Sequence, residues 1–187
     1  MSWTIAPEPF DSPAAAALWR AYYTEVSDRW YLLHEGRRTD PDELEREIAA
    51  QTWEELAPPR GQLLVGRYDG EPGGCAGVRL PPAGAAAVTG TVAATGTVAA
   101  TGAEAAVRAA ELKRVFVREG LRGTGGAALL VRAAEDAARA LGATRMILDT
   151  RGDLVEARAL YARLGYAETD PHNDEPYADH WFARELA

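Results

Sequence analysis

The sequence has little cysteine and little lysine. It contains one cysteine, Cys75, and one lysine, Lys113, among 187 residues. A single cysteine excludes a disulfide within the chain, which is typical of proteins from a reducing compartment. The apolar neighbours of Cys75 indicate a core residue rather than a nucleophile. Arginine and alanine are abundant instead, a bias typical of GC-rich, bacterial coding sequences.

Long apolar runs and an excess of positive charge are also missing. No stretch reaches the ~18 apolar residues that a membrane-spanning helix requires, and the N-terminus lacks the basic and apolar segments of a signal peptide. The formal net charge of -8 argues against a nucleic-acid partner, which needs a basic surface. We therefore expect a cytoplasmic protein that binds neither membranes nor nucleic acid, and whose acidity suits a cationic substrate.

Enough apolar material is present for a folded core. Hydrophobic residues make up 47% of the chain, and its length fits a single domain over residues 1–187. Periodicity and turn residues predict strands at 4–6, 62–68, 74–80, 105–117, 145–150, 166–169 and 180–186, and helices at 12–26, 42–56, 125–141 and 153–164. We expect Ser12 or Asp11 to cap the first helix, and Asp153 with Glu156 to form a capping box at the last.

A repeat at residues 81–103 interrupts this pattern. AAAVTG at 85–90 is followed by two copies of TVAATG, at 91–96 and 97–102. Hexapeptide repeats can build a β-helix, but three copies made of small residues cannot supply a stacked core. We therefore interpret 81–103 as a low-complexity insertion between two strands.

Three glycines stand where the helix at 125–141 begins, namely Gly123, Gly125 and Gly126. Small residues let the main chain approach a ligand closely. The N–H groups of a first helical turn also point outward with the positive end of the helix dipole. Such a turn is an anion site suited to phosphate, and Arg122 adds a positive side chain beside it.

Two ligands and a purely structural turn compete as explanations. Residues 123–128 match the dinucleotide pattern G-x-G-x-x-A, and Asp149 stands near where a ribose-binding acid belongs. That fold places its glycines directly after a strand, whereas residues 118–122 intervene here. The other ligand is the pyrophosphate of coenzyme A.

The segment 104–169 resembles the GNAT superfamily of acetyl-CoA-dependent N-acetyltransferases. The family's motif, R/Q-x-x-G-x-G/A, is met by residues 122–127, which read RGTGGA. A strand-like segment at 111–117 precedes the motif, and a helix, a strand at 146–150 and the run 156–166 follow in the family's order. The resemblance implies an α/β fold with a central mixed, mostly antiparallel sheet and helices on both faces.

The resemblance also implies a site for acetyl-CoA. In the family, the main chain of the strand before the motif binds the pantetheine arm, and the amides of the motif hold the pyrophosphate. The residues implied are Val115, Phe116, Val117, Arg122, Gly123, Thr124, Gly125, Gly126, Ala127 and Tyr161. Leu154 departs from the asparagine that many members carry, which leaves that contact unassigned.

Glu111 is implied as the catalytic base. It lies six residues before Val117, where members with a carboxylate base carry one, and a carboxylate there can take a proton from an ammonium. Alternation along an extended strand predicts one shared face for Glu111, Lys113, Val115 and Val117. The alternative is a structural glutamate that pairs with a neighbouring arginine. Other candidates for the base are His34, His172 and His180.

Tyr161 is implied as the catalytic acid. It matches the family tyrosine that donates a proton to the departing thiolate, and a phenol with a pKa near ~10 holds that proton at neutral pH. Spacing of four residues places Ala157 and Tyr161 on one face of a helix, so the ring can point into a cleft.

The acceptor side is specified least. The family covers it with the first two helices and the last strands, where the candidate contacts are Trp30, Tyr31, Tyr177 and Trp181. The implied reaction is direct acetyl transfer to a primary amine of a small molecule or peptide, in a ternary complex and without a metal. A catalytically silent acyl-CoA-binding sensor is the alternative. The partners expected on this reading are the acceptor amine and a possible second copy of the chain in a homodimer.

Overall fold

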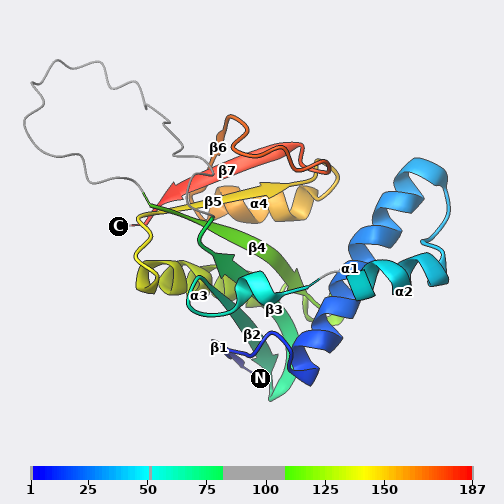
Figure 1. Cartoon of the computed structure of the whole chain (residues 1–187), viewed down its shortest axis with the longest axis horizontal. Helices are drawn as coiled ribbons and strands as arrows, with labels where there is room; N and C mark the ends of the chain where they lie inside the picture. Colours follow the sequence, from blue (N-terminus) through cyan, green and yellow to red (C-terminus); the bar gives the residue numbers. More distant parts are fainter. Residues whose placement is uncertain (1, 51, 82–107, 187) are drawn as a thin grey trace, which may run out of the picture.

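The computed structural model describes residues 2–50, 52–81 and 108–186, and their core is one mixed sheet (Figure 1). The strand order is β1-β2-β3-β4-β5-β7-β6. The strands are β1 Trp3–Pro7, β2 Gly61–Tyr68, β3 Glu71–Arg79, β4 Ala109–Val117, β5 Arg145–Thr150, β6 Ala167–Thr169 and β7 His180–Glu185. Every neighbouring pair is antiparallel except β4 and β5. The predicted mixed, mostly antiparallel sheet is confirmed.

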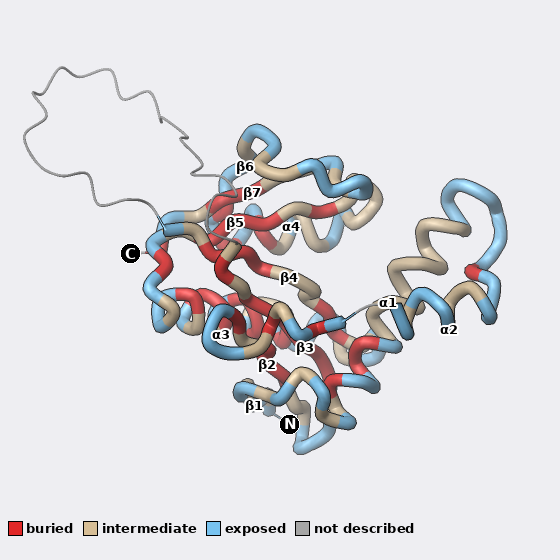
Figure 2. The backbone as a smooth tube through the Cα atoms, viewed as in Figure 1, coloured by how far each residue is buried: buried red, intermediate tan, exposed pale blue. Residues whose placement is uncertain are grey.

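Helices cover both faces of this sheet. They are α1 Pro13–Glu35, α2 Pro41–Ala50, α3 Gly126–Ala140 and α4 Val155–Arg163, with short 3-10 turns η1 Glu54–Leu56 and η2 Glu119–Leu121. One buried cluster joins the sheet to α3 and α4, and a second joins it to α1 and η1. Figure 2 shows α2 and the C-terminal part of α1 extending away from the sheet, and α2 buries no residue at all.

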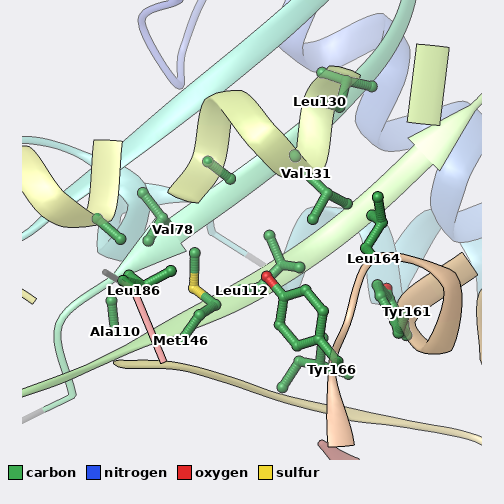
Figure 3. Packing of buried hydrophobic residues seen from close by; sticks show 14 of the residues in the cluster. Val78, Ala110, Leu112, Leu130, Val131, Met146, Tyr161, Leu164, Tyr166 and Leu186 are labelled. Atoms are coloured by element: carbon green, nitrogen blue, oxygen red, sulfur yellow. The ribbon is translucent and has the colours of Figure 1, made fainter. Parts of the chain in front are cut away.

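The larger cluster fixes α3 and α4 against the sheet. Leu130 and Val131 of α3 are fully buried, and Figure 3 shows them with Val78, Leu112 and Tyr161 in the same cluster. Truncating a buried leucine of this kind to alanine costs about 2–5 kcal/mol of folding free energy. These buried contacts therefore hold α3 against the sheet.

Two helices differ in length from the prediction. The side chain of Ser12 caps α1 by accepting from Ala15 N at 3.1 Å, as predicted, but the helix runs past residue 26 to Glu35 because Gly36 supplies the left-handed ending. The predicted helix 42–56 is wrong beyond Ala50. Thr52 Oγ1 accepts from Glu54 N at 3.0 Å and starts the separate turn η1, which buries Leu56.

The predicted capping box of α4 is wrong. Leu154 is the N-cap residue, and no side chain caps this end. The carboxylate of Asp153 instead accepts from Arg151 Nε and Nη2, both at 2.8 Å, and lies 3.0 Å from Arg29 Nε. Two guanidinium groups outcompete the helix amides for this carboxylate because charge-assisted hydrogen bonds are the stronger ones.

A bulge in β4 changes which side chains share a face. Gly77 is opposite Lys113 and Cys75 is opposite Phe116, so β4 holds one extra residue, and Arg114 has a φ of 56°. The alternation of side chains between the two faces of the sheet therefore reverses at the bulge.

The predicted common face for residues 111, 113, 115 and 117 is wrong for this reason. Val115 and Val117 join the cluster beneath α3. Glu111 instead binds Arg79, which also binds Glu55 of η1 on the opposite face.

The predicted insertion at 81–103 lies outside the described residues except for Pro81. Among the residues that are described, no helix is both long enough and apolar enough to cross a bilayer.

Candidate active site

The sheet opens between β4 and β5. Their pairing runs from Ala109 with Arg145 to Glu111 with Ile147 and stops there, while β5 stays paired with β7 as far as Thr150. The two strands diverge beyond this point (Figure 1). Within the described ranges, the β4 edge from Leu112 to Val117 therefore has no strand partner on the β5 side, and its main chain is available to an extended ligand.

The glycine turn lies at the open end of β4. Gly123 and Gly125 have φ values of 80° and 88°, and a Cβ on either one would meet nothing within 4 Å. Gly126, Ala127 and Ala128 form the first turn of α3, whose earliest bond into the turn is Leu129 N to Gly125 O at 3.2 Å. Their amides have no partner within the helix, so they point toward open space with the positive end of the helix dipole.

Trp3 holds this turn from behind. A Cβ on Gly126 would lie 2.3 Å from the indole of Trp3, so only glycine fits there. The indole Nε1 also donates to Thr124 Oγ1 at 2.9 Å, and Thr124 Oγ1 donates to Leu121 O at 2.6 Å. The hydroxyl of Thr124 thus serves the turn itself.

A cleft of about 400 Å³ joins the open edge of β4 to the glycine turn, and we call it the glycine cleft. Its lining includes every predicted acetyl-CoA residue except Thr124. The other walls come from α1 and α4, with Tyr22, Glu25, Val26, Leu154, Glu156, Ala157, Leu160 and Arg163. The predictions missed the α1 wall, although Tyr22, Glu25 and Val26 share one helix face by their three- and four-residue spacing.

Arg122 carries the positive charge at the mouth of the glycine cleft. Its guanidinium donates to both carboxylate oxygens of Glu25 and, through Nε, to Val117 O at 3.2 Å. Both side chains of this ion pair are partly exposed. The carboxylate of Glu25 therefore binds the same guanidinium that an anionic ligand of the turn would contact.

Tyr161 lines the glycine cleft from α4. It is 7% exposed, and its ring packs near Tyr166 and Phe182. Burial raises the pKa of the Tyr161 phenol, and the nearby Tyr22 and Asp149 raise it further. The phenol therefore keeps its proton throughout the neutral range and acts there as a hydrogen-bond donor.

A family model described as "Acetyltransferase (GNAT) family" matches residues 18–166, which include the glycine turn and Tyr161. The chain belongs to this family. No curated protein sequence matches the chain significantly.

Solved GNAT structures share the fold across their whole length. A PaiA N-acetyltransferase from Thermoplasma acidophilum, solved with coenzyme A, has a TM-score of 0.65 at 12% identity, with 99% of each chain covered. A GNAT acetyltransferase from Staphylococcus aureus has a TM-score of 0.62 at 14% identity, with 100% of each chain covered. An acetyltransferase from Thermus thermophilus has a TM-score of 0.58 at 18% identity, covering 100% of this chain and 98% of its own.

This GNAT fold removes the dinucleotide alternative. A dinucleotide-binding fold is a parallel sheet built from successive βαβ units. Among the strands that the structure describes, only β4 and β5 pair in parallel. The glycine turn therefore belongs to an acetyltransferase. It resembles G-x-G-x-x-A because both kinds of turn need small residues where the main chain comes close to a phosphate.

Glu111 of this acetyltransferase lies outside the glycine cleft. It is 4% exposed, and its two carboxylate oxygens contact Lys113 Nζ at 2.7 Å and Arg79 Nε at 2.6 Å. Lys113 Nζ also lies 3.1 Å from Asp149 Oδ2, so it bridges the opening between β4 and β5. Burial lowers the pKa of Lys113, but the carboxylates of Glu111 and Asp149 outweigh this and raise it.

The three histidines occupy different surroundings. His34 Nδ1 contacts Trp30 O at 2.8 Å, and His180 contacts Glu168. His172 lies in the electrostatic reach of Asp149, and neither of its ring nitrogens has a hydrogen-bond partner among the described residues. Burial lowers the pKa of His172, so its ring is neutral and can accept a proton at neutral pH.

A second cavity of about 250 Å³ lies between α1, α2, Arg151 and Tyr177, and we call it the acidic cavity. It contains three of the four predicted acceptor contacts, Trp30, Tyr31 and Tyr177. Trp181 is elsewhere, on β7, where its Nε1 donates to Asn173 Oδ1 at 2.8 Å. The predictions missed Glu43 and Glu47, which line this cavity from α2.

Proposed function

We propose that this GNAT acetyltransferase transfers an acetyl group from acetyl-CoA directly to a primary amine of a small molecule or peptide. The observation that carries the proposal is the continuity of the glycine cleft. An unpaired strand edge, a row of free helix-start amides and a buried protonated phenol line one cavity. Each suits one part of an acyl-CoA, namely the amide-bearing arm, the pyrophosphate and the thioester.

The residues of the cleft fit this donor. Val115 and Val117 offer main-chain groups along an edge that has no strand partner. The open space beside Gly123 and Gly125 admits phosphate oxygens to the amides of the turn. Arg122 supplies the counter-charge. When bound, acetyl-CoA supplies the acetyl group as a reactive thioester. The coenzyme A in the Thermoplasma structure accords with this assignment.

We assign the acid role to Tyr161. Its phenol lines the cleft and keeps its proton at neutral pH because burial raises its pKa. A donor in this place stabilises negative charge that develops on a departing sulfur and can hand over its proton as that charge forms.

The proposal keeps two candidates for the base. Glu111 has the position expected of a carboxylate base, but both its oxygens are held by cations, so a proton must compete with Arg79 or Lys113. His172 has two unpartnered ring nitrogens and a lowered pKa. The pH dependence of kcat/KM separates them. If Glu111 is the base, Glu111→Gln abolishes the rise on the acid side while His172→Gln preserves it, and the reverse result assigns the role to His172.

Calorimetry and thiol release test the proposed function itself. We expect saturable binding of acetyl-CoA and of free coenzyme A, no binding of NADH, and release of coenzyme A thiol that depends on an added amine. Binding without thiol release across a broad panel of amines supports the sensor alternative instead. Absence of coenzyme A binding contradicts the proposal.

A further inference from the structure

The acidic cavity is separate from the glycine cleft, although the two adjoin. Of the residues that line them, Val26 of α1 is common to both. The neighbouring Tyr22 lines the glycine cleft, and Tyr23 lines the acidic cavity. A small molecule that reaches across Val26 can therefore place one end in each cavity.

Aromatic rings form the walls of the acidic cavity. The ring of Trp30 meets Tyr31 edge-on at a centroid distance of 5.0 Å and Tyr177 edge-on at 6.2 Å. His34 stacks on Trp30 at 4.5 Å. Such packed rings present negatively polarised faces without an ionic charge of their own, which attract cations.

Two carboxylates add full negative charge. Glu43 and Glu47 are one turn apart on α2 and both line the cavity. Their side-chain partners are phenols, since Tyr31 donates to Glu43 and Tyr23 donates to Glu47 at 3.3 Å. Neither forms an ion pair with any residue that the structure describes, in contrast to Glu45 between them, which binds Arg20.

Two arginines beside this cavity each bind another carboxylate, although Arg37 is also attracted by Glu43. Arg151 lines the cavity, but it binds both oxygens of Asp153 at 2.8 Å and donates to Val26 O at 2.8 Å. Arg37 lies 4.3 Å over the ring of Tyr31 and donates to a Glu35 oxygen at 2.9 Å. The cavity therefore holds more negative than positive charge.

The phenol of Tyr23 adds no charge to the cavity. Burial, together with the charge of Glu47, raises the pKa of Tyr23 to about 12. The phenol therefore stays neutral at ordinary pH and donates a hydrogen bond to Glu47.

We propose that the acidic cavity binds a second cationic group of the acceptor. The substrate is then an amine that carries an ammonium or guanidinium group apart from the nitrogen that is acetylated. This inference rests on the proposed function, because the reacting nitrogen must reach the glycine cleft beside Tyr161. Aromatic faces and two carboxylates without ion-pair partners are the chemistry that recognises such a cation.

Matched amines test the inference. With 1,5-diaminopentane and 1-aminopentane as acceptors, we expect kcat/KM to favour the diamine by about tenfold or more, the effect of gaining a hydrogen-bonded charge pair. An amine of similar length that ends in a guanidinium separates the two kinds of cation. Glu47→Gln and Glu43→Gln each lower kcat/KM for the diamine by about tenfold and leave the values for 1-aminopentane and acetyl-CoA unchanged.

Glu45→Gln is the matched control, because Glu45 lies on the same helix, outside the lining, and binds Arg20. This variant should leave kcat/KM unchanged for both acceptors. Equal kcat/KM for the two amines, or an equal loss with both in Glu47→Gln, overturns the inference while leaving the proposed function intact.

A binding measurement covers the case in which no amine turns over. Calorimetry with 1,5-diaminopentane alone then decides, with 1-aminopentane as its reference. Binding that weakens in Glu47→Gln but not in Glu45→Gln supports the cation site. Binding that is absent, or equal in both variants, overturns it.

Discussion

The glycine cleft and the acidic cavity are built in different ways. The donor side of the glycine cleft depends on main-chain groups of one short segment, from the end of β4 to the start of α3, and α1 and α4 supply the other walls. The acidic cavity is made of side chains from α1, α2, Arg151 and Tyr177. A main-chain site needs small residues at fixed spacing, which a contiguous motif records. A site made of side chains forms wherever distant segments of the chain meet in the fold, and no contiguous motif records it.

Removing the Tyr161 hydroxyl should have the largest effect, because it takes a reacting proton from a cleft that otherwise binds through its backbone. We expect Tyr161→Phe to lower kcat by about 100-fold, the usual contribution of a general acid, and to leave acetyl-CoA affinity nearly unchanged. Steady-state kinetics and calorimetry measure the two quantities.

Tyr166→Phe is the control for that variant. Tyr166 is buried nearby, but its hydroxyl donates to Glu135 at 3.0 Å and does not line the cleft. Its loss should lower stability with little change in kcat. An equal fall of kcat in both variants would show that Tyr161 acts through packing.

Gly125→Ala tests whether the cleft depends on its main chain. The alanine must adopt a φ near 88°, which strains its backbone, so we expect about 1–2 kcal/mol of lost stability. Its methyl group also fills the space beside the amides of the turn. Acetyl-CoA should bind at least about tenfold more weakly, as when one charge-assisted hydrogen bond is lost.

Gly70→Ala separates the strain from the binding. Gly70 has a φ of 92° and the same open surroundings, but it lies in the turn between β2 and β3. We expect a similar loss of stability, measured by thermal unfolding, and unchanged acetyl-CoA affinity. Equal weakening of acetyl-CoA binding in both variants contradicts a specific role for Gly125.

Glu25→Gln should produce a smaller effect of the opposite sign. The variant frees Arg122 from its carboxylate partner, so acetyl-CoA should bind more tightly. We expect a gain of up to about fivefold, which corresponds to the free energy of a partly exposed ion pair. The gain should shrink at high salt, which screens exposed charges. Calorimetry at two salt concentrations measures it, and weaker binding in this variant would show that Glu25 helps to hold the donor.

The smallest effect concerns the pH dependence of stability. The pKa of His172 is lowered in the folded chain, so its contribution is present above the unfolded pKa of about 6.5 and is lost as pH falls through the lower folded value. We expect thermal unfolding of His172→Gln to depend less on pH below about 6.5 than that of the parent. Parallel curves would show that the ring is not buried in its neutral form.

The contrast between the two sites also explains what the sequence predicted. The strand before the glycine turn, the turn, α3, β5 and the α4 tyrosine follow one another along the chain, and local pattern was enough to predict them. The α1 wall of the glycine cleft was missed because Glu25 meets Arg122 across 97 positions of sequence. Nothing local in either segment indicates that ion pair.

Two errors had tertiary causes. The bulge at Arg114 puts a non-glycine residue at a φ of 56°, and β4 itself contains no glycine or proline that marks this position. The capping role of Asp153 was lost to Arg151, two residues before it, and to Arg29, which arrives from α1. The length of α1 was predictable in principle, because Gly36 stands where the helix ends.

The position of Lys113 has a consequence for the protein's own chemistry. A protein that holds a reactive thioester risks acylation of its own lysines, since an unprotonated side-chain amine attacks such a donor without help. This chain has a single lysine, and its ammonium is fixed 2.7 Å from Glu111 and 3.1 Å from Asp149, with a raised pKa. The ammonium of this lysine therefore keeps its proton at neutral pH, and under the proposed function we expect it to be a poor acceptor of the acetyl group.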